Sequence, residues 1–214
     1  MKQLIILALT FALLGCFACT KKTDTGATAA PAAEAGDALP SDLMALFNTP
    51  MSADEALAAA KEARVVVMES VKVTSGREVW NEFFERTEAG EKAAVLTAKY
   101  YTLDPERVDP ALYAQEKDNY PVLYFTLITY DGDLFEYTVK DSKTAGTDSS
   151  GRYLFLKHYE GKLRQGAAFD AYDRYELVND ENVTWEELEW GMFSSQFGDY
   201  IPFHTAYCDF YDND

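Results

Sequence analysis

Two side chains near the C-terminus, His204 and Cys208, have the types that could do nucleophilic or metal chemistry. An imidazole beside a thiol can activate it as a nucleophile, and both groups can bind a metal ion. Pro202 and the alternating aromatic residues around the pair favour a strand. In a strand, positions four apart share a face but lie about 13 Å from each other, at about 3.3 Å per residue. Because that separation is too long for either chemistry, Cys208 is predicted to be a buried structural thiol.

The rest of the sequence contains no motif for nucleophilic, metal or nucleotide chemistry. The serine-hydrolase elbow, the S-x-x-K and H-E-x-x-H signatures, the P-loop and the dinucleotide-binding glycines are all missing. The other histidine, His158, has no carboxylate partner in the nearby sequence. No catalytic residue, metal site or cofactor is therefore predicted. A hydrolase that uses two carboxylates stays open as an alternative, because their separation decides such chemistry and the sequence does not give it.

Acidic side chains concentrate at the C-terminal end of the chain. Residues 170–214 contain 12 Asp and Glu against a single basic residue, Arg174. The segment lacks the D-x-[DN]-x-[DN]-G series of a calcium loop. It can be a solvated acidic surface, a docking face for a basic protein, or a weak cation site. The candidate binding residues of this end are Tyr200, Tyr207, Asp209, Tyr211 and Asp212.

Three helices are predicted to begin at capping boxes. In this pattern a serine or threonine and a glutamate three residues later satisfy free backbone amides at the helix start. The pairs are Ser52 with Glu55, Ser75 with Glu78, and Thr184 with Glu187. After Thr184, the apolar residues Trp185, Leu188 and Met192 recur at helical spacing and predict a core-facing stripe.

Strands are predicted where the hydrophobic period changes from 3.6 to 2. They cover residues 65–73, 95–103, 122–130, 134–140, 153–159, 172–178 and, as a final strand, 203–211. Asp131 and Gly132, between two of these strands, predict a type I′ hairpin turn. Residues 104–119, with Pro105 and Pro110, are predicted to form a surface loop, which is either a connector or a binding loop.

The order of these elements predicts an α+β fold. A mainly antiparallel sheet of five to seven strands, with two or three helices packed on one face, is expected because no alternating βαβ pattern occurs. Within residues 122–130, apolar Leu123 and Phe125 alternate with Tyr124 and Thr126. The face that carries Tyr124 and Thr126 is predicted to be half-solvated. These two residues are also candidate binding residues, since the alternative is a ligand platform.

The composition supports one folded domain and limits its partners. With 48% hydrophobic and 14% aromatic residues, the 214-residue chain has enough apolar material for a core. Its formal net charge of −17 argues against binding nucleic acid or an anionic membrane through charge.

The N-terminal residues predict export and lipid attachment. Lys2 and a short apolar run form a secretory signal that is too short to span a bilayer. The sequence Leu13-Leu14-Gly15-Cys16 resembles the lipobox of bacterial lipoproteins. This resemblance implies cleavage after residues 1–15 and a diacylglyceryl group on Cys16, with Cys19 as the alternative. Residues 16–40 are then the lipidated cysteine and a flexible Ala/Thr/Pro tether, and residues 41–214 are a single α+β domain.

The chain as a whole also resembles small uncharacterised lipoproteins of Gram-positive anaerobes. The similar features are the leader, the tether, the strand at residues 65–68, the helix with Trp80 and Phe84, and Tyr130-Asp131-Gly132. The resemblance implies a location and no activity. The sequence therefore predicts an extracytoplasmic domain, held to the cell membrane by lipid alone, that binds a basic protein or a glycan and no nucleic acid. The carboxylate-dependent envelope hydrolase is the alternative function.

Overall fold

The structure is a computed structural model that describes residues 38–212, apart from 145, 195 and 197. The described residues all belong to one compact unit. The predicted export signal, Cys16, Cys19 and nearly all of the tether lie outside the described residues. Export and lipid attachment therefore stay predictions. Within the described part, no helix is both long enough and apolar enough to cross a membrane.

The described residues form five α-helices and nine strands. The helices are α1 (Ser41–Asn48), α2 (Ala53–Glu62), α3 (Arg77–Glu88), α4 (Pro110–Glu116) and α5 (Trp185–Phe193). The first five strands are β1 (Val66–Glu69), β2 (Lys72–Ser75), β3 (Ala93–Tyr101), β4 (Val122–Tyr130) and β5 (Phe135–Asp141). The others are β6 (Thr147–Tyr153), β7 (Phe155–Lys162), β8 (Ala171–Val178) and β9 (His204–Tyr211).

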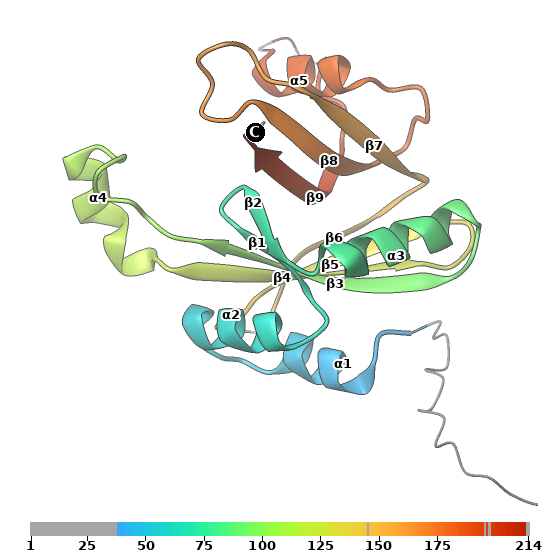
Figure 1. The fold of residues 1–214 in the computed structure, drawn as a ribbon, viewed down its shortest axis with the longest axis horizontal. Coiled ribbons are helices and arrows are strands. Elements are labelled where there is room, and N and C mark those ends of the chain that lie inside the picture. The colour runs from blue at the N-terminus through green and yellow to red at the C-terminus, as the bar shows by residue number, and fades with distance from the viewer. Residues whose placement is uncertain (1–37, 145, 195, 197, 213–214) are drawn as a thin grey trace, which may run out of the picture. The chain divides into compact units, whose positions relative to one another are not determined.

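The strands make two sheets rather than the predicted one (Figure 1). The larger has the order β2-β1-β3-β4-β5-β6 and is mixed, since β1 and β3 pair in parallel while its other pairs are antiparallel. The smaller is antiparallel, with the order β7-β8-β9. The combination of helices and strands is confirmed. The prediction of a single sheet is wrong, because the run of strands divides after β6 into a second sheet, and the described residues contain five helices rather than two or three. The pairing is mainly antiparallel as predicted, with β1 and β3 as the exception.

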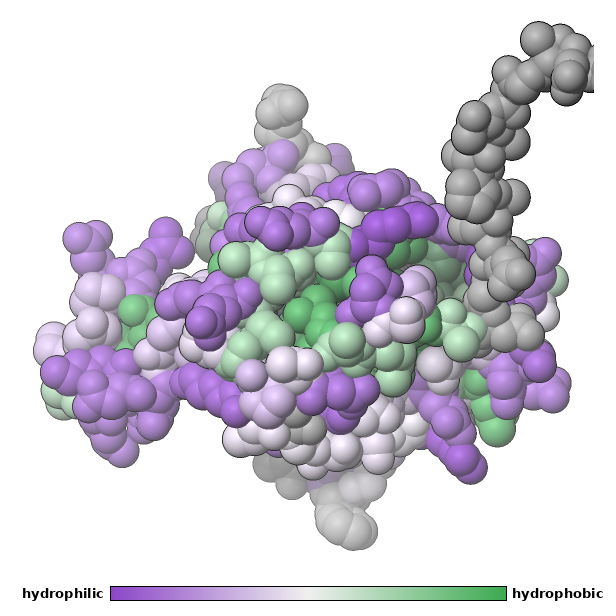
Figure 2. Space-filling model, turned by 90° about the horizontal axis from the view of Figure 1, so that it is seen from below, coloured by the Kyte–Doolittle hydropathy of each residue, from purple (hydrophilic) through white to green (hydrophobic). Residues whose placement is uncertain are grey.

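Helices cover both faces of the larger sheet, and the prediction of one covered face is therefore wrong. On one face, α1 and α2 bury Leu43, Phe47 and Ala56 against Leu96 and Phe125. Figure 2 looks at the molecule from below and shows apolar residues gathered at the centre of this side, ringed by hydrophilic ones. On the other face lie α3 and the smaller sheet.

The layer between the two sheets is an aromatic core centred on Trp80 of α3. The indole ring is fully buried, and its centroid lies 4.9 Å from that of Tyr207 and 5.1 Å from that of Tyr175. Tyr207 and Tyr175 belong to adjacent strands of the smaller sheet. This layer covers the face of β4 that was predicted to be half-solvated. Thr126, at the centre of that face, is only 2% exposed.

Two of the three predicted capping boxes are confirmed, at Ser52 and at Thr184. The third is wrong, because Ser75 ends β2 and α3 starts after Gly76, which takes φ = 76°. A Cβ atom at Gly76 would lie 2.3 Å from the carbonyl oxygen of Val65. The close approach of this chain segment, rather than a side-chain cap, therefore determines how α3 begins.

Three predicted segments differ from the structure for local reasons. The strand at residues 65–73 is a hairpin of β1 and β2, which reverses at Ser70 with φ = 59°. The loop at residues 104–119 contains α4, because the Asp109 side chain accepts hydrogen bonds from the amides at the helix start. The strand at residues 153–159 is the junction of β6 and β7. Sequence reasoning missed β6 because its mostly exposed, polar residues show no alternation.

The hairpin after Tyr130 is confirmed, but its turn type is not. Tyr130 pairs with Phe135, and the amide of Asp131 donates a hydrogen bond to the carbonyl of Leu134. Gly132 has a positive φ, whereas a type I′ turn requires positive values at both central residues. The Asp131 carboxylate accepts the amides of Asp133 and Leu134 instead.

Candidate functional site

Helix α5 and the segment that returns to it form the candidate site. The helix starts at the Thr184 capping box and ends where Ser194 leaves the helical conformation. Buried Leu188 holds it on the smaller sheet. Gly191 lets the returning chain come close, since a Cβ atom there would lie 2.6 Å from the carbonyl oxygen of Asp199. This close approach places Asp199 beside the exposed side of the helix.

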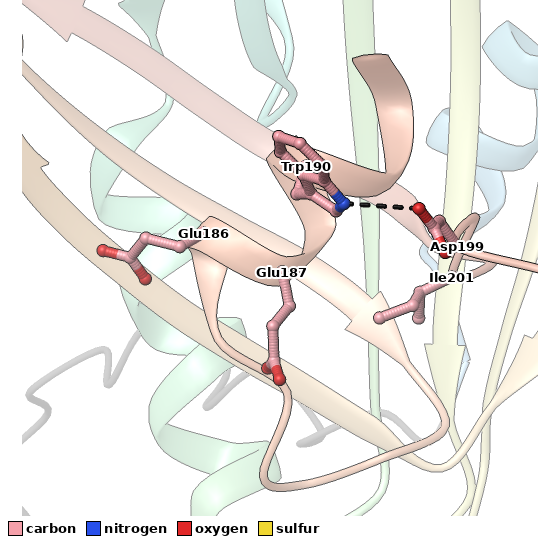
Figure 3. A pocket seen from close by; sticks show the side chains of 5 residues that line it. All are labelled: Glu186, Glu187, Trp190, Asp199 and Ile201. Atoms are coloured by element: carbon pink, nitrogen blue, oxygen red, sulfur yellow. Dashed lines mark hydrogen bonds between the residues drawn. The ribbon is translucent and has the colours of Figure 1, made fainter. Parts of the chain in front are cut away.

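A pocket of about 310 Å³ opens between α5 and this returning segment (Figure 3). Its lining residues are Glu186, Glu187, Trp190, Asp199 and Ile201. The indole nitrogen of Trp190 donates a hydrogen bond of 3.3 Å to Asp199 Oδ2, and the Ser194 hydroxyl donates one of 2.5 Å to the same oxygen. The two donors fix the Asp199 carboxylate against the ring. Figure 3 also shows Glu186 pointing away from Asp199.

The pocket is strongly acidic. Hydrogen bonds from the backbone amide and side chain of Thr184 lower the pKa of Glu187, so this carboxyl is ionised at neutral pH. Among the described residues, no ion pair includes Glu186, Glu187 or Asp199. The carboxylates around Trp190 are therefore available to a cationic group.

Large apolar side chains are exposed around the same pocket. Trp190 is 65% exposed, Phe193 80% and Tyr200 58%. Met192, which was predicted to face the core, is 43% exposed, and that part of the predicted stripe is wrong. Gly191, next to Met192 in the helix, is buried instead, because the returning segment at Asp199 lies too close to the helix there for a larger side chain.

A second groove of about 570 Å³ lies beside the first turn of α5. Residues 157–160 of β7, Tyr172 of β8 and residues 181–186 line it. Glu186 lines both hollows, which makes them neighbours. Trp185 forms part of the second groove, and the guanidinium of Arg174 lies 3.5 Å from the centre of its ring.

The chemistry of the pocket suits an organic cation. A carboxylate held beside an exposed indole face attracts an ammonium or guanidinium group through charge and through the π-system of the ring. An indole adds nothing to a calcium or magnesium site, which is built from oxygen ligands. No group of three or more His, Cys, Asp and Glu side chains in the described part of the chain is arranged to hold a metal ion.

The structure does not bring the predicted binding residues together. Tyr200 lies beside the pocket residues Asp199 and Ile201, and Tyr211 and Asp212 are exposed at the end of β9, where Asp212 pairs with Lys72 at 3.6 Å. Tyr207 and Asp209 are buried and are therefore unavailable to a partner. They hold Arg77 at the start of α3, and Asp209 also accepts the amide of Val73 at 2.8 Å.

Four other residues singled out from the sequence lie in strand pairs, ring contacts or the core and line neither pocket. Tyr124 of β4 lies opposite Lys99 of β3 on one side and Asp141 of β5 on the other, and Thr126 is buried. His204 stacks on Tyr137 at 3.8 Å between centroids. Cys208 is half-buried, and burial raises the pKa of its thiol to about 11, which disfavours the reactive thiolate.

One histidine has a partner that the sequence did not indicate. His158 Nε2 lies 2.8 Å from Asp173 Oδ1 on the neighbouring strand, and Asp173 in turn lies 3.9 Å from Arg77. The His158 ring stacks on buried Tyr175 at 4.3 Å. This network ties α3 to the smaller sheet. Strand pairing created it, so no local sequence signal could have revealed it.

A buried charged cluster lies beneath the candidate site. Glu176 is fully buried and is paired with Arg174, whose Nε donates to Glu176 Oε1 at 2.6 Å. Burial raises the pKa of Glu176 and lowers that of Lys99, whose ammonium donates to the carbonyl of Thr205 at 2.6 Å. Arg174 and Glu176 share one face of β8, the face on which Arg174 stacks against Trp185 of α5, and none of the three charged groups lines either pocket.

Comparisons with known proteins give no match: no family model matches the chain, and no curated protein or solved structure is detectably similar to it. The functional argument therefore depends on the geometry of the described residues. Sequence reasoning singled out the acidic C-terminal region but missed Trp190 and Ile201. The available signal was that Trp190 falls outside the apolar stripe begun by Trp185 and Leu188.

Proposed function

We propose that this chain is a lipid-anchored, extracytoplasmic binding domain whose α5 pocket receives a cationic group of a basic protein. The observation that carries the proposal is the exposed Trp190 ring, hydrogen-bonded to Asp199 in a pocket whose carboxylates have no ion-pair partner among the described residues. A bound ammonium or guanidinium relieves the repulsion among these carboxylates and lies against the ring.

The expected affinity for one isolated cationic group is low. A cation over an exposed aromatic ring contributes about 0.5–1 kcal/mol, and each exposed ion pair adds about as much. A single lysine side chain should thus bind with a dissociation constant on the order of ten millimolar. Useful affinity requires several such contacts, which fits a basic protein better than a small cation.

The carboxylates support binding more than hydrolysis. A glycoside hydrolase of the usual kind needs a general acid with a raised pKa in a cleft opposite a second carboxylate. Glu176 has a raised pKa, but it is fully buried and paired with Arg174. Glu187, in the pocket, has a lowered pKa and serves as a helix cap.

Titration of the full chain in mild detergent with Nα-acetyl-lysine amide tests the pocket. We expect Asp199→Asn to weaken binding by about two- to fivefold, because it removes one ion pair and keeps the shape of the side chain. Glu189→Gln removes the same charge from the same helix outside the pocket and should change binding by less than about twofold. Equal losses in both variants, or tighter binding of N-acetylglucosamine than of the lysine amide, would contradict the proposal.

The anchor needs a separate test, since Cys16 and Cys19 lie outside the described residues. Cells that express the chain are fed an alkyne analogue of palmitate, and the purified chain is examined for the label. We expect labelling of the wild-type chain and none of the variant Cys16→Ala/Cys19→Ala. Equal labelling of both, or recovery of the uncleaved chain from the cytosol, would refute lipid anchoring.

A further inference from the structure

Strand β7 is a regular sheet edge to which no other described strand is bonded. It ends the order β7-β8-β9 and pairs with β8 over all eight of its residues without a bulge. The other edges of the described sheets differ. The outer edge of β9 is bonded to the β1–β2 turn, since Phe210 N donates to Val71 O at 2.9 Å. The amide of Val73 in β2 donates to Asp209, and the ladder of β6 contains a register shift.

The second groove runs along this edge. Consecutive strand residues point to opposite faces, so a hollow that touches residues 157–160 one after another lies at the edge of the strand and not on one face. Its floor includes Tyr159, Tyr172 and Trp185. The Tyr172 hydroxyl reaches across to Gly161, 2.7 Å from where a Cβ atom would be, so the ring extends over the edge strand.

The charges around the groove select the kind of chain that fits there. Glu160, Glu181 and Glu186 line it together with one lysine, Lys157. The Lys157 ammonium already donates to the carbonyl of Glu181 at 2.5 Å, and no ion pair of the described residues involves the three glutamates. Aromatic rings beside carboxylates accept the aliphatic stem and the charged end of lysine or arginine.

From this combination we propose that an extended basic peptide segment of a partner protein binds as an added strand at the free edge of β7. Its backbone pairs with the outward amides and carbonyls of β7, and alternate basic side chains enter the groove. Glu186, shared with the α5 pocket, lets a neighbouring basic residue of the same segment reach Trp190. The inference rests on the proposed function for the charge of the ligand, while the strand addition is independent of it.

The test uses the full chain in mild detergent and an acetylated, amidated octapeptide of alternating lysine and threonine. Two methylated versions carry N-methyl groups on the lysine amides or on the threonine amides. Successive amides of a strand point to opposite edges, so all lysine amides point to one edge and all threonine amides to the other. One methylated peptide therefore loses its hydrogen bonds to β7 and the other keeps them. We expect one methylated peptide to bind at least about tenfold more weakly than the parent and the other to bind like the parent.

Hydrogen exchange at single-residue resolution identifies the edge. With the parent peptide, alternate amides of β7 should exchange at least about tenfold more slowly, while those of β6, the matched control edge, should not change. Equal binding of both methylated peptides overturns the strand addition. If both methylated peptides bind equally to the wild-type chain but bind more weakly to Asp199→Asn, the proposed cation pocket is still supported. A glutamine–threonine peptide that binds equally well overturns the basic ligand, and β7 amides protected without peptide assign the edge to this chain itself.

Discussion

Replacement of Arg174 by methionine should lower the free energy of unfolding at pH 7 by about 3–5 kcal/mol. Arg174 is the ion-pair partner of fully buried Glu176, and its guanidinium also stacks on Trp185. Methionine keeps the apolar stem but leaves the Glu176 carboxylate without its main counter-charge in a poorly solvated environment. Urea unfolding followed by tryptophan fluorescence measures the change.

The double variant Arg174→Met/Glu176→Gln separates the uncompensated charge from the loss of packing. It should recover most of the stability, because no buried carboxylate remains to be paired. The raised pKa of Glu176 gives a second check. A raised folded-state pKa stabilises the fold most below the unfolded value of 4.5, and this contribution is lost as the pH rises through the folded pKa. The cost of Arg174→Met should therefore shrink on acidification, and a cost independent of pH would contradict this account.

Replacement of His204 by phenylalanine should remove much of the acid sensitivity of the fold. Burial, with a contribution from Lys99, lowers the pKa of His204 from 6.5 to about 3. Between these two pH values the His204 imidazole binds a proton in the unfolded chain but stays neutral in the folded chain. The stabilising contribution is thus complete above pH 6.5 and is lost as the pH falls toward 3. At pH 4 the loss amounts to about 3 kcal/mol.

Unfolding curves at a series of pH values test this expectation. Between pH 7 and pH 4 the wild-type chain should lose about 3 kcal/mol more stability than His204→Phe, which keeps an aromatic ring against Tyr137. His204→Leu removes the same titration without the ring. It should be less stable at pH 7 but show the same shallow pH dependence. If the stability of His204→Phe falls in parallel with that of the wild type, His204 does not titrate as described.

Local signals in the sequence predicted the elements with strong periodicity and specific caps. Residues 122–130 are β4 without any shift of the boundaries, and the capping boxes at Ser52 and Thr184 are present. The start of α3 was wrong because Gly76 is fixed by the approach of Val65, a tertiary contact. The alternation in β4 was correct, but it could not reveal that its mixed face is covered. The covering layer comes from α3, which precedes β4 in the chain, and from strands that begin 25 or more residues after β4 ends.

The candidate site, too, could be predicted only in part from the sequence. The charge of residues 170–214 indicated an acidic end, and Asp199 and Tyr200 do lie in or beside the pocket. Tyr207 and Asp209 were misplaced because their alternation with Ala206 and Cys208 does not show which face of β9 is buried. The smaller sheet turns both residues toward Trp80 and Arg77. The pocket itself depends on the return of the chain to Gly191, which sequence spacing does not encode.

The most direct test of the cation pocket compares choline with its neutral isostere, 3,3-dimethyl-1-butanol, in titrations of the full chain followed by tryptophan fluorescence. The two molecules have the same shape and differ in charge. Our account predicts a saturable change with choline that weakens in Asp199→Asn and with added salt, and a much smaller response to the alcohol. Equal responses to both molecules would show that the pocket recognises apolar shape and would contradict the proposed function.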